Sequence, residues 1–138
     1  MSTTPPYIQA AWEAALAARM RAYAPYSRFQ VGAAIVLADG TIVPGCNVEN
    51  ASYGGTICAE RTAILGAIAH HGRQPLQAVV VVADVTPTVV PCALCLQVIA
   101  EHGTPELPIY LGDLHGIRER VRLADLLPRA FTSSSLPR

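Results

Sequence analysis

The chain has 138 residues, of which 51% are hydrophobic and 14% are charged, and its ten acidic and ten basic residues cancel at pH 7. This neutral balance argues against binding to nucleic acid through a global electrostatic field. The sequence shows no signal-peptide pattern and no apolar run of about 18 residues, so we expect a soluble, cytoplasmic protein that does not bind or cross a membrane.

The first half of the chain predicts a helix followed by a β-hairpin. Apolar side chains recur at helical spacing over residues 7–23, which predicts an amphipathic helix. Residues 29–37 and 41–46 predict two strands, and Asp39-Gly40 between them is typical of a hairpin turn. The polar stretch that follows predicts a loop.

The second half predicts helices around a buried strand. Helical spacing over residues 57–71 is ended by Gly72, and the valine run at 78–83 is typical of a strand buried on both faces. A further helix is predicted at 91–102. The remaining predicted elements are short: strands at 107–111 and 117–121 and a helical turn at 123–127.

Helices that alternate with buried strands predict an α/β fold, a three-layer α/β/α sandwich around a mixed sheet of about five strands. The length favours a single domain over residues 1–138, with flexible ends at 1–6 and 132–138. The apolar composition leaves hydrophobic surface for subunit contacts, so we expect an oligomer rather than a monomer.

Three of the four cysteines form a pattern typical of a catalytic zinc site. Cys58 and Cys92 fall at predicted helix starts, where the helix dipole favours thiolate, and Cys95 lies one turn beyond Cys92. Three sulfur ligands leave the fourth position of a zinc tetrahedron for water. Glu60 is placed to move that water's proton, and Arg61 can offset the excess negative charge of the thiolates.

Other interpretations use the same cysteines. With Cys46 they could form a closed structural site, although such sites usually have two paired knuckles and this chain has one CxxC. Cys46 can instead act as a small apolar residue at a strand end. A redox pair would fit the CxxC but leaves Cys58-Ala59-Glu60 unexplained.

Five segments match one family pattern. They are YAPYSRFQVGAA at 23–34, GCNVENASY at 45–53, CAERTA at 58–63, Pro91-Cys92 with Cys95 and Gln97, and Leu126-Leu127-Pro128 followed by Phe131. Across nearly its whole length the chain resembles the small, homotetrameric, zinc-dependent cytidine deaminases.

This resemblance implies hydrolytic deamination of cytidine and 2′-deoxycytidine to uridine and 2′-deoxyuridine, with release of ammonia, as in pyrimidine salvage. One zinc ion per subunit would be held by Cys58, Cys92 and Cys95, and Glu60 would carry protons during the reaction. The partner would be a small nucleoside, and the active sites would be shared between the subunits of a homotetramer.

The resemblance also implies roles for residues around the metal and the substrate. Asn47 and Glu49 would hydrogen-bond the ribose 3′-hydroxyl, Phe29 would form an aromatic wall, and the Ala59 amide would contact the base carbonyl. Tyr53 and Phe131 would reach the site from neighbouring subunits, and Phe131 would cover the base. Two residues would lie just behind the zinc ligands, namely Arg61 and Gln97.

Three positions depart from the family's Ser-Pro-Cys-Gly-x-Cys-Arg-Gln pattern, namely Val90, Ala93 and Leu96. They leave open a deaminase of a modified or antibiotic nucleoside, such as the blasticidin-S type. A non-catalytic zinc-binding assembly protein is a further alternative. An enzyme acting on polynucleotides would need a basic track with stacking aromatic residues, and none is evident.

Overall fold

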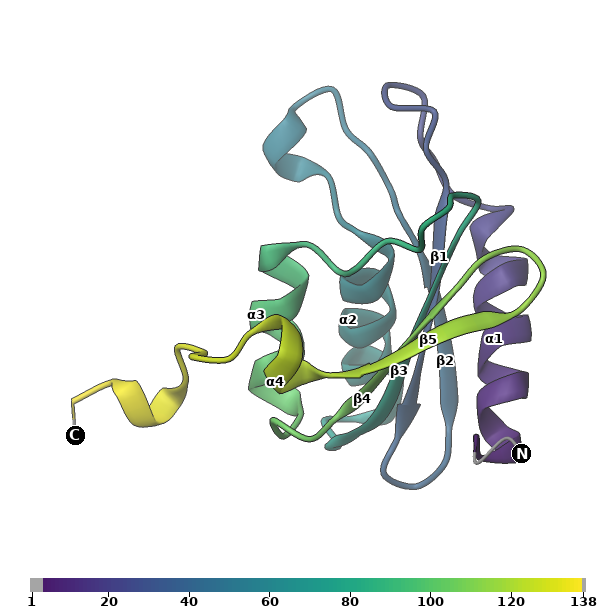
Figure 1. The fold of residues 1–138 in the computed structure, drawn as a ribbon. Coiled ribbons are helices and arrows are strands. Elements are labelled where there is room, and N and C mark those ends of the chain that lie inside the picture. Colours follow the sequence, from purple (N-terminus) through teal and green to yellow (C-terminus); the bar gives the residue numbers. More distant parts are fainter. Residues whose placement is uncertain (1–3, 138) are drawn as a thin grey trace.

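A mixed five-stranded sheet forms the middle layer of the molecule (Figure 1). The computed structural model describes residues 4–137, and the strand order across the sheet is β2-β1-β3-β4-β5. Strands β3 and β4 run parallel, and the other neighbouring pairs are antiparallel. The strands are Val31–Leu37 (β1), Ile42–Cys46 (β2), Leu76–Ala83 (β3), Pro108–Gly112 (β4) and Ile117–Arg122 (β5). This topology confirms the predicted mixed sheet.

Helices cover both faces of the sheet. Helix α1 (Pro6–Arg19) packs on one face, and helices α2 (Ala59–His71) and α3 (Ala93–His102) lie side by side on the other (Figure 1). A short helix, α4 (Leu123–Leu126), follows β5. The predicted three-layer α/β/α sandwich is therefore confirmed.

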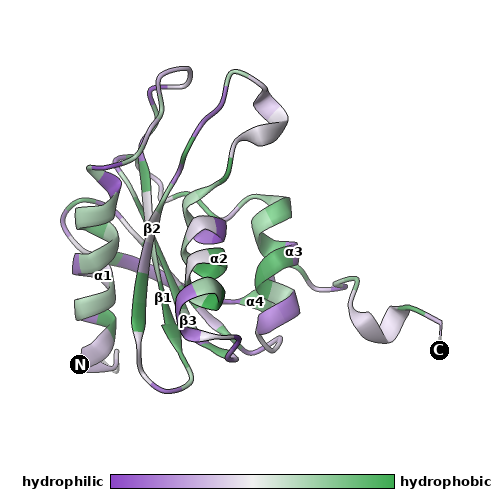
Figure 2. Ribbon diagram, turned by 180° about the vertical axis from the view of Figure 1, so that it is seen from behind, coloured by the Kyte–Doolittle hydropathy of each residue, from purple (hydrophilic) through white to green (hydrophobic). Residues whose placement is uncertain are grey.

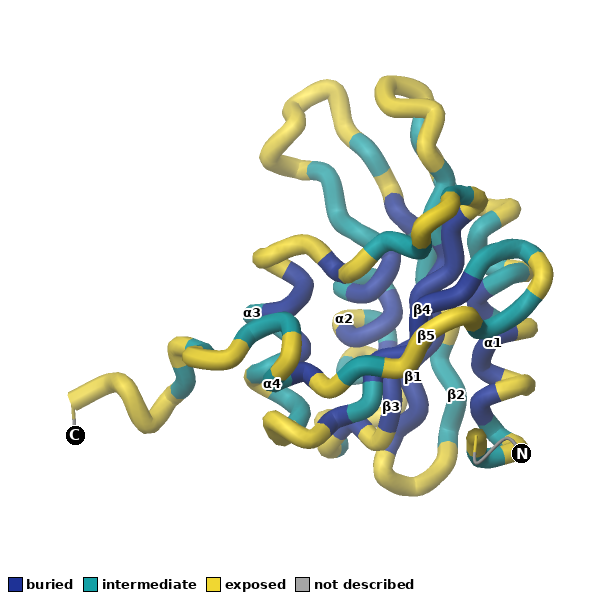
Figure 3. Tube along the Cα trace, in the orientation of Figure 1, coloured by how far each residue is buried: buried dark blue, intermediate teal, exposed yellow. Residues whose placement is uncertain are grey.

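The two faces of the sheet bury separate cores, because successive residues of a strand point to opposite sides. On the α1 face, Val80 and Val82 pack with Ile8 and Trp12. On the α2 and α3 face, the core includes Ile35, Val79, Val81, Ile64 and Ile99. Hydrophobic residues concentrate along the strands (Figure 2), and the centre of the sheet is buried (Figure 3). Burial on both faces explains the valine run of β3.

Helix α2 lies so close to β2 that no side chain larger than that of glycine fits at position 45. A methyl group at Gly45 would lie 2.5 Å from the Ala59 carbonyl oxygen, the Ala63 amide nitrogen and the Thr62 Oγ1. Thr62 Oγ1 also donates a hydrogen bond across this contact to the Cys46 carbonyl oxygen at 2.8 Å. The start of α2, which carries Glu60, is thereby held against the sheet.

We expect Gly45→Ala to lower the free energy of unfolding by about 1–3 kcal/mol, because the added methyl group overlaps the backbone of α2. Gly54→Ala is the matched control, since a methyl group there meets nothing within 4 Å. Urea unfolding of both zinc-loaded variants measures the difference. Equal transition midpoints would contradict the close approach of α2 to β2.

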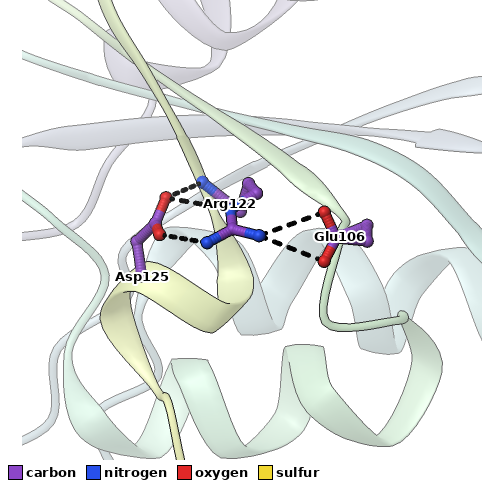
Figure 4. Close-up of polar contacts among 3 residues, drawn as sticks. All are labelled: Glu106, Arg122 and Asp125. Atoms are coloured by element: carbon purple, nitrogen blue, oxygen red, sulfur yellow. Dashed lines mark hydrogen bonds and ion pairs between the residues drawn. The ribbon is translucent and has the colours of Figure 1, made fainter.

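An exposed ion cluster links Arg122, at the end of β5, to Glu106 and Asp125 (Figure 4). Arg122 Nη1 lies 3.1 and 3.2 Å from the two carboxylate oxygens of Glu106. Its Nη2 lies 2.8 Å from Asp125 Oδ1, and its backbone amide donates to Asp125 Oδ2 at 2.8 Å. Exposed pairs contribute little stability, roughly 0–1 kcal/mol each. The main effect of the cluster is therefore to orient α4.

The ends of the chain are only partly covered by the structure. Residues 1–3 and 138, which belong to the segments predicted to be flexible, lie outside the described residues. Pro6 is already the first residue of α1, and Ser133–Ser135 form a short 3₁₀ helix. Between residues 4 and 137, no helix combines the length and apolar character that a membrane crossing requires.

Candidate active site

The three predicted cysteine ligands meet where α2 and α3 begin. Cys58 is the N-cap residue of α2, Cys92 is the N-cap residue of α3, and Cys95 is buried in the first turn of α3. Their sulfur atoms all lie within 4.8 Å of one another, and Cys58 Sγ lies 3.7 Å from Cys92 Sγ. Neither N-cap side chain makes a capping hydrogen bond, so both thiols are free to face a shared point.

Arg61 lies against this cluster, as predicted for a residue that offsets its charge. The guanidinium Nη2 donates a hydrogen bond to Cys58 Sγ at 3.5 Å. Its Nε is buried and, within the described part of the chain, has no hydrogen-bond partner. A partly buried guanidinium with a donor to spare favours negative charge on the neighbouring sulfurs.

The thiols influence each other's ionisation. The pKa of Cys58 is lowered to about 5, chiefly by a hydrogen bond from Cys95 and then by those from Arg61 and Cys92. The same hydrogen bond, together with burial, raises the pKa of Cys95. A cation between the sulfurs would favour the thiolate form of both Cys58 and Cys95, and soft thiolate ligands suit zinc.

Glu60 is a buried carboxylate beside the sulfurs, with 4% of its surface exposed. Burial raises its pKa to about 7, and the negative charge of Cys58 acts in the same direction. A carboxyl group with this pKa can both accept and donate a proton near neutral pH.

A cavity of about 350 Å³ opens beside the cysteine cluster. Its walls come from the start of β1, the loop after β2, the start of α2 and the segment before α3. The lining residues are Ser27, Phe29, Val31, Asn47, Glu49, Thr56, Cys58, Ala59, Glu60, Val81, Val89, Val90 and Cys92. The lining thus combines apolar side chains, among them four valines, with carboxylate, amide and sulfur groups.

Asn47 and Phe29, both predicted to contact substrate, are linked in this cavity wall. Asn47 is buried, and its Nδ2 donates to the Phe29 carbonyl oxygen at 2.8 Å. Its Oδ1 accepts from the Val31 amide at 2.8 Å. An amide side chain has a further hydrogen and lone pair, so Asn47 can hold the wall and still bind a hydroxyl group.

Glu49 organises the loop in front of the cavity. Its Oε1 accepts hydrogen bonds from the amides of Tyr26 and Ser27 at 2.9 and 3.0 Å, and the Ser27 hydroxyl donates to its Oε2. The Ser27 hydrogen bonds also lower the pKa of Glu49. Ser27 Oγ in turn accepts from the Phe29 amide at 3.0 Å, which connects Glu49 to the aromatic wall.

The two aromatic residues predicted to act from a neighbouring subunit do not line this cavity. Tyr53 is 78% exposed and lines an adjoining hollow, where its ring meets that of Tyr26 edge-on. Phe131 is 58% exposed, on the segment after α4. Gln97, predicted to lie behind the zinc ligands, donates its hydrogen bond to the Phe131 carbonyl oxygen rather than to a sulfur.

Sequence reasoning gave no role to several lining residues. Ser27 stands inside a quoted motif, and its hydroxyl type is the signal that could have marked it as a loop-holding residue. Thr56 accepts a hydrogen bond from the Asn50 amide at 3.1 Å. Val81 and Val89 carry no comparable signal, because their position at the cavity depends on how the strands and loops pack.

Comparison with known proteins identifies the family of this site. The family model described as the cytidine and deoxycytidylate deaminase zinc-binding region matches residues 6–111, which include all three clustered cysteines and Glu60. The chain belongs to the cytidine and deoxycytidylate deaminase family.

Individual relatives agree with this assignment. The chain is 48% identical to the cytidine deaminase of Halalkalibacterium halodurans over 122 residues, covering 88% of this chain and 92% of the relative. It is 50% identical to the cytidine deaminase of Mycobacterium tuberculosis over 117 residues, covering 85% and 84% of the two chains. The crystal structure of the Burkholderia pseudomallei cytidine deaminase superposes with a TM-score of 0.82 at 47% identity, covering 95% of this chain and 100% of that one.

The metal of this deaminase family is zinc, and the residues present fit it. Cys58, Cys92 and Cys95 are positioned at two helix starts to hold the ion, and the Arg61 guanidinium lies beside them. Among residues 4–137 this is the one group of three or more metal-binding side chains. Cys46 is not part of it, and burial raises the pKa of its thiol. The four-cysteine structural site is therefore not supported.

Cys46→Ala should leave close to one zinc ion per subunit, because this half-buried thiol stands apart from the cluster. Zinc released on denaturation, measured with a chromogenic chelator, tests this. Loss of zinc from the variant would restore the structural interpretation of the four cysteines.

Proposed function

We propose that this chain catalyses the hydrolytic deamination of cytidine and 2′-deoxycytidine, giving the uridine products and ammonia. The observation that carries the proposal is the buried Glu60 beside three clustered sulfurs, on the wall of a cavity of about 350 Å³. The relatives named cytidine deaminase, at 48% and 50% identity, support the same reaction.

Glu60 and Ala59 have separate roles in the proposed reaction. When bound, zinc supplies the Lewis acidity that makes a water molecule nucleophilic near neutral pH. Glu60 takes one proton from the water that attacks C4 of the base and passes it to ring N3. It then takes the second proton, from the hydroxyl group formed on C4, and passes it to the amine, which leaves as ammonia. The amide of Ala59, in the first turn of α2, has no partner within the helix and can donate to the base carbonyl.

The cavity wall suits the remaining parts of a nucleoside. Phe29 offers a partly exposed ring against which the base can lie. Asn47 and Glu49 line the same cavity and offer a donor and an acceptor for the ribose 3′-hydroxyl. Their hydrogen bonds to the loop at 26–31 hold both groups in place before substrate arrives.

The charges of the cavity favour a nucleoside over a nucleotide. The lining residues include the carboxyl groups of Glu49 and Glu60, and none is an arginine, the only basic residue type in this chain apart from histidine. A phosphate group binds where cationic side chains or amide donors neutralise it. Deoxycytidylate would thus enter a site with no cation to receive it.

Ammonia release from a panel of substrates tests this proposal. Cytidine and 2′-deoxycytidine should be turned over, whereas CMP, deoxycytidylate and adenosine should not. Blasticidin S belongs in the panel because Val90 lines the cavity where the family pattern has serine. Turnover of deoxycytidylate or blasticidin S in preference to cytidine would replace the proposed substrate.

The site is further proposed to be completed in a homotetramer acting in the cytoplasm. The exposure of Tyr53 and Phe131, away from their own cavity, supports their action in a neighbouring subunit. The four cysteines are free thiols, which suits a reducing compartment. Light scattering during size-exclusion chromatography measures the subunit number, and a monomer with full activity would refute the shared site.

Phe131→Ala should raise KM for cytidine about 5- to 150-fold, because an aromatic–base stack contributes roughly 1–3 kcal/mol. The melting temperature should change little, since this ring is largely exposed. Leu136→Ala, another exposed apolar residue of the same segment, is the control and should leave KM unchanged. An unchanged KM in Phe131→Ala would remove this residue from the site.

A further inference from the structure

The C-terminal segment 129–137, called the tail below, extends away from the body of the domain after α4 (Figure 1). Its residues are exposed except for two of intermediate burial (Figure 3). The tail therefore has no apolar core of its own to set its direction. The direction of the tail therefore depends on its contacts with the domain.

One side-chain hydrogen bond joins the tail to the domain next to Phe131. Gln97 Nε2 donates to the Phe131 carbonyl oxygen at 2.8 Å. Among the described residues, the other hydrogen bonds of the tail stay within it. They link Thr132 to Ser134 and Ser135, and the Leu136 amide to the Ser133 carbonyl oxygen.

Gln97 lies on the helix that also carries two of the three clustered cysteines of its own subunit. It lies on α3, two residues beyond the buried Cys95, and Cys92 is the N-cap residue of the same helix. The hydrogen bond thus connects a helix that carries two metal ligands to the residue whose ring is proposed to cover the base. It engages the backbone of Phe131 and leaves the ring free to make other contacts.

We infer that Gln97 is a positioning residue, which holds the tail against α3 so that Phe131 reaches the substrate of the neighbouring subunit in a fixed orientation. This inference rests on the proposed function of Phe131. Without the hydrogen bond, the tail samples more conformations, and substrate binding must then order it.

Gln97→Met tests the inference, because methionine keeps the length of the side chain but cannot donate. We expect KM for cytidine to rise about three- to tenfold with less than a twofold change in kcat, as one lost hydrogen bond allows. Zinc content should remain unchanged, and the amides of the tail should exchange hydrogen faster. Gln97→Glu, which also cannot donate, should behave alike. Gln77→Met is the control, since Gln77 donates to Tyr7 on another side of the molecule.

A double variant separates positioning from a merely structural role. If Gln97 acts through Phe131, Gln97→Met should not raise KM further in a Phe131→Ala background. A further rise there, or unchanged tail exchange in Gln97→Met, would overturn the inference, as would an unchanged KM in Phe131→Ala. Failure of the wild-type protein to deaminate cytidine would instead refute the proposed function, and tail exchange would still decide whether Gln97 holds the tail.

Discussion

Glu60→Gln is expected to lower kcat by about 10²–10⁴-fold, the usual contribution of a positioned proton carrier. Glutamine keeps the size of the side chain but cannot take a proton from water. The protein should stay folded with its zinc, because burial penalises the charged form of Glu60 and the amide carries no charge. Steady-state ammonia release and zinc content are the two measurements.

Glu13→Gln provides the matched control, because Glu13 lies exposed on α1, on the opposite face of the sheet. Its turnover should equal that of the wild type. Zinc retention with undiminished turnover in Glu60→Gln would support the non-catalytic zinc-binding alternative and contradict the proposed reaction.

Cys95→Ala should weaken zinc binding by roughly 10²-fold or more. Zinc held by four protein ligands is bound by about 10–16 kcal/mol, so each ligand contributes on the order of 3 kcal/mol. Cys95 is fully buried, which leaves no room for another side chain to replace its sulfur. Competition with a chelator of known affinity measures the loss, and turnover at limiting zinc should fall with it.

Cys46→Ala is the control for this variant, since it makes the same chemical change outside the cluster. Equal zinc affinities for the two variants would mean that Cys95 is not a ligand. The three-sulfur site would then have to be abandoned.

The order of the elements could be predicted from sequence because hydrophobic spacing and turn residues mark it locally. Their boundaries depended on contacts between distant segments. Helix α1 was predicted to reach residue 23 but ends at Arg19, because Tyr23 pairs with Val48: the Tyr23 amide donates to the Asn47 carbonyl oxygen, and its own carbonyl accepts from Glu49. Helix α2 begins at Ala59 rather than 57, since Ile57 pairs with Val48.

In the candidate site, too, features marked by local sequence could be predicted, whereas features that depend on contacts between distant segments could not. Cys58, Cys92, Cys95 and Glu60 could be predicted because their spacing and residue types report metal chemistry directly. The hydrogen bonds that join Asn47 and Glu49 to the loop at 26–31 could not, since they arise only when two chain segments approach each other. For the same reason no local pattern predicted that Gln97 binds the Phe131 carbonyl.

The missing side-chain caps at the starts of α2 and α3 affect how this protein unfolds. Cys58 and Cys92 occupy positions where serine, threonine or aspartate would tie down the first amides, and neither does so. A zinc ion bound by their sulfurs would therefore add stability to the first turns of both helices, whereas the sheet depends on its two apolar cores. Removal of zinc by a chelator should accordingly loosen the first turns of α2 and α3 while the sheet stays folded. Loss of activity should therefore precede global unfolding.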